Sequence, residues 1–303
     1  MKINPVIVKE LRGRMRGWRS LLILVIYLSV LSIISMMIYA AAKNAGAGFN
    51  SPQSSQVGKA IFFGLVTFQA IMVALLTPAF TSSAITQERE QKTYELLVTT
   101  LLPARSIIMG KLGSALAYVA LLIIAIAPLE SLAFMFGGVS PEEIILSQVV
   151  MLFAALLFAS VGIFWSSIVK TSVASNVLTY GTILFLTLGV PFIYYIVTTM
   201  TMTSSYYGTS SVNTEGFFYF SLIMLSSHPV IALGMSEMYY LRGDSLFIYT
   251  TDNWGMFSSN GNTVLIISPW LLFCIEALLF SAILIFFSIS RVQPVRYKSP
   301  LSS

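Results

Sequence analysis

The chain has 303 residues, of which 56% are hydrophobic and only 10% are charged, and its formal net charge is +5. Soluble domains carry about 25% charged residues, so this composition excludes an ordinary soluble domain and favours lipid as the solvent. The basic residues lie beside hydrophobic blocks instead of forming one basic surface, so we expect no nucleic-acid partner. The single cysteine, Cys274, lies in an apolar stretch, which excludes an internal disulfide and favours a packing role.

The N-terminal residues 1–19 have an amphipathic pattern. Lys9, Arg12 and Arg16 recur on one helical face and apolar residues on another, which predicts a helix lying in the membrane interface. Two glycines in the same segment weaken a helix. The alternative is therefore a solvated basic flank that only fixes the orientation of the protein in the membrane.

Six apolar blocks follow, each long enough to cross a hydrocarbon core of about 30 Å, which takes roughly 20 helical residues. The predicted transmembrane helices cover residues 20–42, 60–84, 112–136, 144–169, 176–198 and 263–290. The first block is too long for the apolar region of a signal peptide, which has about 7–15 residues. Between the last two blocks lies a polar, aromatic region, residues 199–262, which is predicted to be extracytoplasmic.

Region 199–262 contains a shorter apolar stretch, residues 217–235, interrupted at 226–229 by Ser, Ser, His and Pro. The chain has 17 Lys and Arg residues. If it has six spans, six of these basic residues lie before the first span and four lie between the second and third. Lys170 lies between the fourth and fifth spans, and three basic residues follow the sixth, so all of these are cytoplasmic. Cytoplasmic flanks collect Lys and Arg, and a seventh span would move the last three outside. Residues 217–235 are therefore predicted to form a re-entrant or interfacial hairpin.

The predicted fold class is thus all-α integral membrane, in a single transmembrane domain over residues 1–303. It is a bundle of six transmembrane helices with an N-terminal interfacial helix, a cytoplasmic coupling helix and an extracytoplasmic hairpin before the last helix. Both termini are expected in the cytoplasm, and membrane lipid is expected as the surroundings.

Most catalytic signatures are missing from the sequence. Gly110-Lys111 is followed by leucine and lacks the spacing of a P-loop, so the chain is expected to have no ATPase site of its own. One histidine and one cysteine are too few for a usual zinc site. His228 and Ser236 make a poor serine-protease pair, since a turn histidine before a proline explains the residue. We expect no catalytic residue, metal or cofactor in this chain.

Two carboxylates lie within or near predicted spans, where ionisable groups are costly and point to function. Glu130 follows Lys111 by about 20 residues, so it is expected near the outer interface, where solvation explains it. Glu276 is expected in the outer half of the membrane and needs a partner. It either binds a cationic substrate or proton, or forms a hydrogen bond with a neighbouring helix such as the one that bears Gln69.

The most charged interior stretch runs from Glu88 to Lys111. Tyr94 and Leu97 lie on one face at helical spacing and charged residues flank this face, so residues 86–105 are predicted to form an amphipathic cytoplasmic helix. Such a helix between two spans can dock in a groove on a soluble partner and transmit its movement. The alternative is a charged loop that only fixes topology.

This stretch resembles the permease subunits of ABC-2 type ABC transporters. In that family a Glu-Arg-Glu leads into a Thr, a Glu-Leu-Leu and a Gly-Lys that opens the third helix. The matching residues are Glu88, Arg89, Glu90, Thr93, Glu95, Leu96, Leu97, Gly110 and Lys111. The resemblance extends to Lys9-Glu10-Leu11-Arg12, the six-span layout and the outer hairpin. Lys92 stands where the family often has glycine, and Leu101 where it often has proline.

The resemblance implies two permeases, identical or homologous, and two ABC ATP-binding subunits that bind ATP and Mg²⁺, in the cell membrane of a prokaryotic-type cell. It implies an ATPase-coupling contact through Glu88, Arg89, Glu90, Thr93, Tyr94, Glu95, Leu96 and Leu97. A second contact is implied for the interfacial helix, with Lys9, Glu10, Arg12 and Arg16.

The resemblance also implies that the second and fifth spans form the dimer face and that export is the direction of transport. Two alternatives remain open. One is an ABC-type complex that does mechanical work or signalling without moving a solute, and the other is an ion-coupled secondary transporter that uses Glu276.

Overall fold

A computed structural model describes residues 18–44, 54–93, 103–206, 214–240, 247–250 and 265–292. Within these residues, six helical stretches are long and apolar enough to cross a membrane, which confirms the all-α membrane fold. The helices are α2 (Trp18–Asn44), α3 (Ser54–Thr81), α4 (Thr86–Glu90), α6 (Ala104–Ala125), α7 (Ala127–Met135), α8 (Pro141–Ile168), α9 (Ser172–Leu184), the π-helical turn η1 (Phe185–Gly189), α10 (Val190–Tyr206), α11 (Thr214–Ser226), α12 (Pro229–Tyr240) and α13 (Pro269–Arg291).

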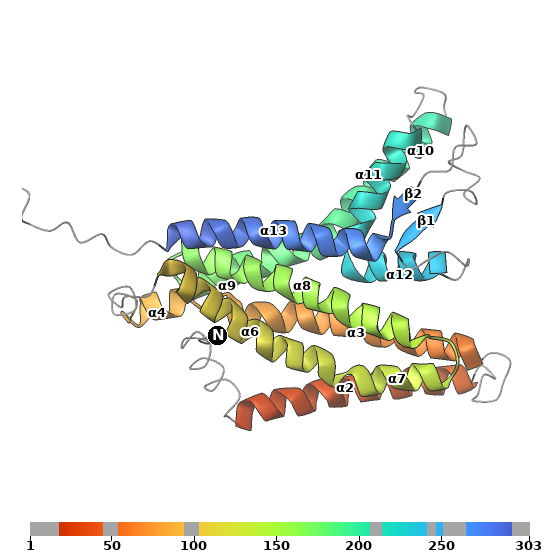
Figure 1. The fold of residues 1–303 in the computed structure, drawn as a ribbon, viewed down its shortest axis with the longest axis horizontal. Helices are drawn as coiled ribbons and strands as arrows, with labels where there is room; N and C mark the ends of the chain where they lie inside the picture. The colour runs from red at the N-terminus through yellow and green to blue at the C-terminus, as the bar shows by residue number, and fades with distance from the viewer. Residues whose placement is uncertain are drawn as a thin grey trace, which may run out of the picture.

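Helix α8 is the centre of the bundle and packs against α3, α6, α9 and α13 (Figure 1). Small side chains fill its middle, including Ala154, Ala155, Ala159 and Ser160, all of them buried. Because lipid tails are as apolar as the core, helices in a membrane associate through close van der Waals packing, which small residues allow. The composition of α8 therefore explains its central position.

Gly162 lies where α8 crosses the end of α3. A Cβ atom at this position would overlap the hydroxyl of Thr81 and lie 3.1 Å from the backbone nitrogen of Ser82. A contact with backbone is not relieved by moving one flexible side chain, so the crossing requires glycine. It fixes the end of α3 and, through it, the position of α4.

Two predicted spans are broken helices in the structure. The helix predicted over 112–136 begins earlier, at Ala104, and divides at Ile126 into α6 and α7. Pro128 accounts for the break, because its ring carries no amide hydrogen and obstructs the preceding turn. The helix predicted over 176–198 contains η1, and such a widened turn bends the helix axis.

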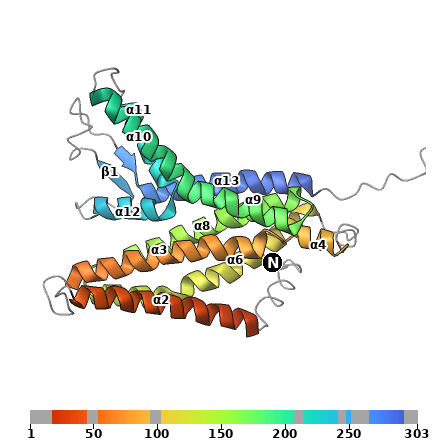
Figure 2. The same cartoon turned by 180° about the vertical axis from the view of Figure 1, so that it is seen from behind.

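The bundle has two distinct ends. The start of α2, the start of α6, the end of α13 and α4 itself lie at one end, called here the α4 end (Figure 1). At the opposite end, the α12 end, α2 leads into α3 and α7 leads into α8. The view from behind shows α9 and α10 running along one flank, with α10 turning away from the other spans (Figure 2).

The region between α10 and α13 contains two helices and a two-stranded ribbon. The break between α11 and α12 falls at Ser227 and His228, where the sequence predicts an interruption. Strands β1 (Ile248–Thr250) and β2 (Leu265–Ile267) pair antiparallel. This ribbon was not predicted from the sequence, and the helix predicted over 263–290 begins only at Pro269 because β2 precedes it. How the α11–α12 hairpin meets the membrane stays a prediction.

Candidate functional site

The site at the α4 end begins with a turn between α3 and α4 that α8 holds in place. The hydroxyl of Ser166, near the end of α8, accepts hydrogen bonds from the backbone N–H groups of Ile85 at 2.8 Å and Thr86 at 3.1 Å. The first N–H groups of a helix have no partner within the helix itself. Ser166 therefore caps α4 from another helix and fixes its start.

Glu88 connects α4 to α6. Its carboxylate forms an ion pair with the ammonium group of Lys111, with 2.7 Å between Oε1 and Nζ. The side chain of Lys111 is only 5% exposed. A hydrogen bond between two charged groups at this distance is among the strong ones in proteins, so α4 and the start of α6 are held as one unit.

Arg89 connects α4 to the end of α8. Its guanidinium donates to the backbone carbonyl of Ser167 at 2.9 Å and to that of Val169 at 3.1 Å. The last carbonyl groups of a helix lack partners within the helix and carry partial negative charge. The planar fork of donors on arginine satisfies two of them at once.

Glu90 connects α4 to the start of α9. Its carboxylate accepts hydrogen bonds from the backbone N–H of Ser172 at 2.7 Å and from the hydroxyl of the same residue at 2.8 Å. A carboxylate is favoured at a helix N-terminus by the unpaired N–H groups there. The consecutive residues Glu88, Arg89 and Glu90 thus bond to three different helices, α6, α8 and α9.

Of the helix predicted over 86–105, the structure describes the first part as α4, which ends at Glu90, and residues 94–102 lie outside the described residues. Lys92 adopts a positive φ of 57°, and the N–H of Thr93 donates to the carbonyl of Glu88 at 3.0 Å. These features form a helix C-cap in which the left-handed residue is usually glycine. Lys92 stands where the resembled family often has glycine, and its backbone conformation is one that suits glycine.

The outward side of α4 is solvent-accessible. Gln87, Gln91, Lys92 and Thr93 are exposed. Next to them, α3, α4 and α6 enclose a polar hollow of about 410 Å³, with Glu88 and Lys111 in its wall. The remaining predicted coupling residues, Tyr94, Glu95, Leu96 and Leu97, lie outside the described residues. The same holds for Lys9, Glu10, Arg12 and Arg16.

The expectation that Glu130 is solvated at the interface is wrong. Its side chain is 0% exposed and lies between α7 and α8. The amide of Gln148 donates to its Oε2 atom at 2.6 Å, and the hydroxyl of Ser147 does so at 3.5 Å. The residue lies inside the bundle because α7, after the break before Pro128, is turned with this side toward α8.

Glu276 has a partner, but not on the helix that bears Gln69. Its two carboxylate oxygens accept from the hydroxyl groups of Ser226 at 3.3 Å and Ser227 at 2.8 Å. Gln69 instead donates to the carbonyl of Ile123 at 3.5 Å. Glu276 therefore ties α13 to the turn between α11 and α12.

Ser166, Ser167 and Ser172 were not predicted as site residues. Their signal in the sequence is weak, because polar residues at the end of an apolar block are common at any membrane interface. They have a role only because, in the folded chain, α4 lies against the turn between α8 and α9.

Comparison with known proteins gave one family. A family model described as ABC-2 family transporter protein matches residues 5–271. No curated protein matched the chain. The matched range includes α4, all three of its attachments and every span before α13.

Proposed function

The chain belongs to the ABC-2 transporter family, and on this premise we propose that its α4 end receives movement from separate ATP-binding subunits. Membership makes the chain a multi-pass membrane protein and the permease component of an ABC transporter. The observation that carries the proposed coupling is the attachment of α4 to three spans through Glu88, Arg89 and Glu90. The permease itself supplies no nucleotide site, and ATP and Mg²⁺ belong to the partner.

The distribution of charge supports a cytoplasmic α4 end. Among the described residues, the basic ones near that end are Arg19, Arg89, Lys92, Arg105, Lys111, Lys170 and Arg291, and those near the α12 end are Lys43 and Lys59. Cytoplasmic flanks of membrane proteins collect Lys and Arg. In the cell membrane, both termini and α4 then face the cytoplasm, where soluble ATP-binding subunits reside.

The attachments of α4 suit it to transmit force. A partner that presses on the exposed residues Gln87 and Gln91 pushes α4 against α6, α8 and α9 together. Because charge-assisted hydrogen bonds are short and strong, α4 moves with these helices instead of sliding over them. Closure of two ATP-binding subunits on ATP would in this way change the access of the spans from inward to outward.

A second permease, identical or homologous, completes the proposed transporter. The flank formed by η1 and α10 supports this, because none of residues 184–203 is buried and many are large and apolar, including Leu188, Phe192 and Met200. Lipid or a second permease covers such a face. The proposed direction is export, and the runner-up function is an ABC complex that does mechanical work without moving a solute.

Disulfide or thiol cross-linking in native membranes tests the coupling. The single native cysteine, Cys274, is buried, so a cysteine placed at exposed Gln91 is the reactive one. Gln91→Cys should cross-link to a P-loop ATPase, whereas Glu142→Cys, exposed at the α12 end, should not. If Gln91→Cys and Thr93→Cys both fail to capture an ATPase in membranes where the protein is intact, the α4 contact is refuted.

A further inference from the structure

A buried carboxyl group crosses the contact between α7 and α8, inside the bundle and away from α4. Glu130 of α7 is 0% exposed, and its Oε2 atom accepts from the amide of Gln148 at 2.6 Å and from the hydroxyl of Ser147 at 3.5 Å. Its other oxygen, Oε1, is buried and has no hydrogen-bond partner. One half of this carboxyl group is therefore left unsatisfied in the interior of a membrane protein.

Gln148 has the matching deficiency. Its Nε2 group donates to Glu130, whereas its carbonyl oxygen, Oε1, is buried and has no partner. A carboxylate and an amide carbonyl can only accept, so an ionised Glu130 leaves both oxygens unsatisfied. A protonated carboxyl group carries one O–H donor. One proton on Oε1 of Glu130 thus supplies the donor that Oε1 of Gln148 lacks, and the two side chains form a ring of two hydrogen bonds.

The other orientation of the Gln148 amide leads to the same protonation state. With oxygen and nitrogen exchanged, the amide oxygen would lie 2.6 Å from Oε2 of Glu130. Two acceptors at this distance need a proton between them. Both orientations therefore require a proton on Glu130.

No positive charge offsets an ionised Glu130 among the described residues. Helix α7 packs against α2, α3, α6 and α8. Lys59 of α3 pairs with Glu237, and Lys111 of α6 pairs with Glu88. The other basic residues of these helices are Arg19 and Arg105 at the α4 end and the exposed Lys43 at the end of α2. Residues 45–53, which join α2 to α3, include no charged residue. A buried carboxylate without a counter-charge is costly, and neutralisation removes this cost.

Two neutral donors that would favour a charge on Glu130 are not used for it. The hydroxyl of Tyr27, on α2, lies within electrostatic range of Glu130 but is buried and makes no hydrogen bond. Glu130 also lies in the first turn of α7, where unpaired N–H groups favour negative charge. The N–H groups of Leu129 and Glu130 itself, however, donate to the carbonyl of Ile126.

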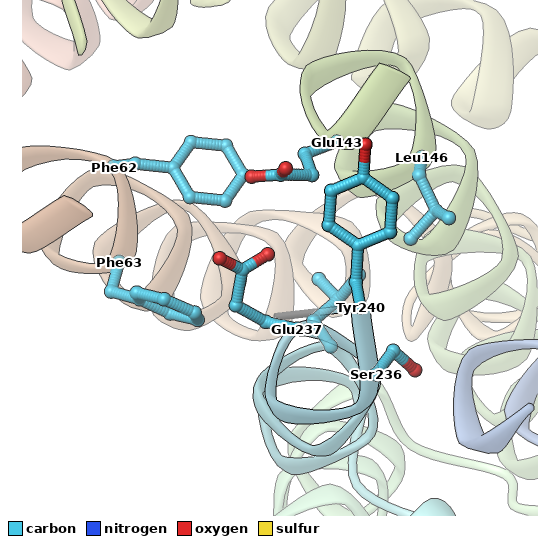
Figure 3. A pocket seen from close by; sticks show the side chains of 8 residues that line it. Phe62, Phe63, Glu143, Leu146, Ser236, Glu237 and Tyr240 are labelled. Atoms are coloured by element: carbon cyan, nitrogen blue, oxygen red, sulfur yellow. The ribbon is translucent and has the colours of Figure 1, made fainter. Parts of the chain in front are cut away.

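The remaining titratable groups on the neighbouring helices are engaged elsewhere. The ring of Tyr39 packs against Phe136, beyond the end of α7, and that of Tyr118 packs against Phe80. On α8, Glu142 is exposed. Figure 3 shows the carboxyl group of Glu143 turned toward the space that it shares with Glu237 and Tyr240. Glu130 is therefore left to Gln148 and Ser147.

We propose that Glu130 is a proton-binding site, which donates its proton to Oε1 of Gln148 and so fastens α7 to α8 by a neutral acid–amide pair. Helix α7 continues from α6 across the break at Ile126, so this pair helps to fix its orientation. Loss of the proton to water leaves a carboxylate facing an amide carbonyl without a counter-charge, which weakens the contact of α7 with α8. The site does not depend on the ATPase coupling proposed above, because neither residue bonds to α4.

Infrared difference spectroscopy on the full-length protein in detergent tests the protonation state. A protonated carboxyl group and an ionised carboxylate absorb at well-separated frequencies. The difference between the wild type and Glu130→Gln at pH 7 should contain the band of a protonated carboxyl group, and the band should shift in D₂O. Gln148→Leu should move the same band to higher frequency, because it removes both hydrogen bonds of the pair. This second variant gives the result independently if Glu130→Gln does not fold.

The unfolding equilibrium measures the bound proton. In an unfolded chain a glutamate carboxyl group ionises above about pH 4.3, so between pH 5 and pH 7 unfolding of the wild type releases the proton of Glu130. Stability falls as the pH rises wherever the folded state binds more protons. The unfolding constant of the wild type should rise, relative to that of Glu130→Gln, by about tenfold for each pH unit. Glu142→Gln, which removes an exposed carboxyl group, should follow the wild type.

Three results would overturn the proposal. The first is a difference spectrum at pH 7 that contains only carboxylate bands, which would mean a charged Glu130 with an ordered water in place of the proton. The second is a Glu130 band that Gln148→Leu leaves unchanged. The third is the same pH dependence of unfolding in the wild type and in Glu130→Gln.

Discussion

Replacing Glu88 by glutamine should destabilise the protein by about 2–3 kcal/mol, because a hydrogen bond to a charged group contributes about 1.5–3 kcal/mol. The carboxylate lies 2.7 Å from the ammonium of Lys111, and the side chain of Lys111 is 5% exposed. The side chain of Glu88 is 22% exposed, so water replaces only part of the lost contact. For a chain of this size, the melting temperature should fall by about 4–6 °C, at roughly 2 °C for each kcal/mol.

A double-mutant cycle in thermal unfolding checks this reasoning. Glu88→Gln combined with Lys111→Met should cost less than the sum of the two single changes, by at least about 1 kcal/mol. Glu142→Gln removes an exposed carboxylate at the other end and should change stability by no more than about 1 kcal/mol. Additive single effects would mean that the two residues do not hold α4 to α6, and the proposed path of force would lose its first step.

Three further predictions concern single residues. Lys92→Gly should raise stability by about 0.5–1 kcal/mol in thermal unfolding, because glycine adopts the positive φ of this cap without strain. Gly162→Ala should lower it by about 1–3 kcal/mol, since the added methyl group overlaps Thr81 at the crossing of α8 and α3. Burial lowers the pKa of His228, so the stability that the neutral ring contributes is present at neutral pH and is lost as the pH falls below about 6.5.

Each of these predictions has its own control. Gln91→Gly, next to Lys92, should destabilise, because that residue has no positive φ to relieve. Gly181→Ala should be well tolerated, as a Cβ atom there meets nothing within 4 Å. His228→Gln should flatten the loss of stability at acid pH, and an unchanged pH profile would contradict the role assigned to the ring.

The spans were predictable from the sequence because their physical cause is local. A run of about 20 apolar residues crosses the lipid as a helix whatever its neighbours are. Pro128 and η1 break two of these helices without ending a span, so the membrane topology survives while the helix boundaries shift. The ribbon of β1 and β2 was missed because its two three-residue strands are too short to give an alternating pattern.

The attachments of α4 were not predictable in the same way. The charges of Glu88, Arg89 and Glu90 were recognised, but their partners on α8 and α9 are about 80 residues away in the chain. A helical wheel assigns side chains to faces and gives no information on which distant helix end lies opposite. Glu130 was misjudged for a related reason, since a count of residues along a straight helix cannot register the break at Ile126.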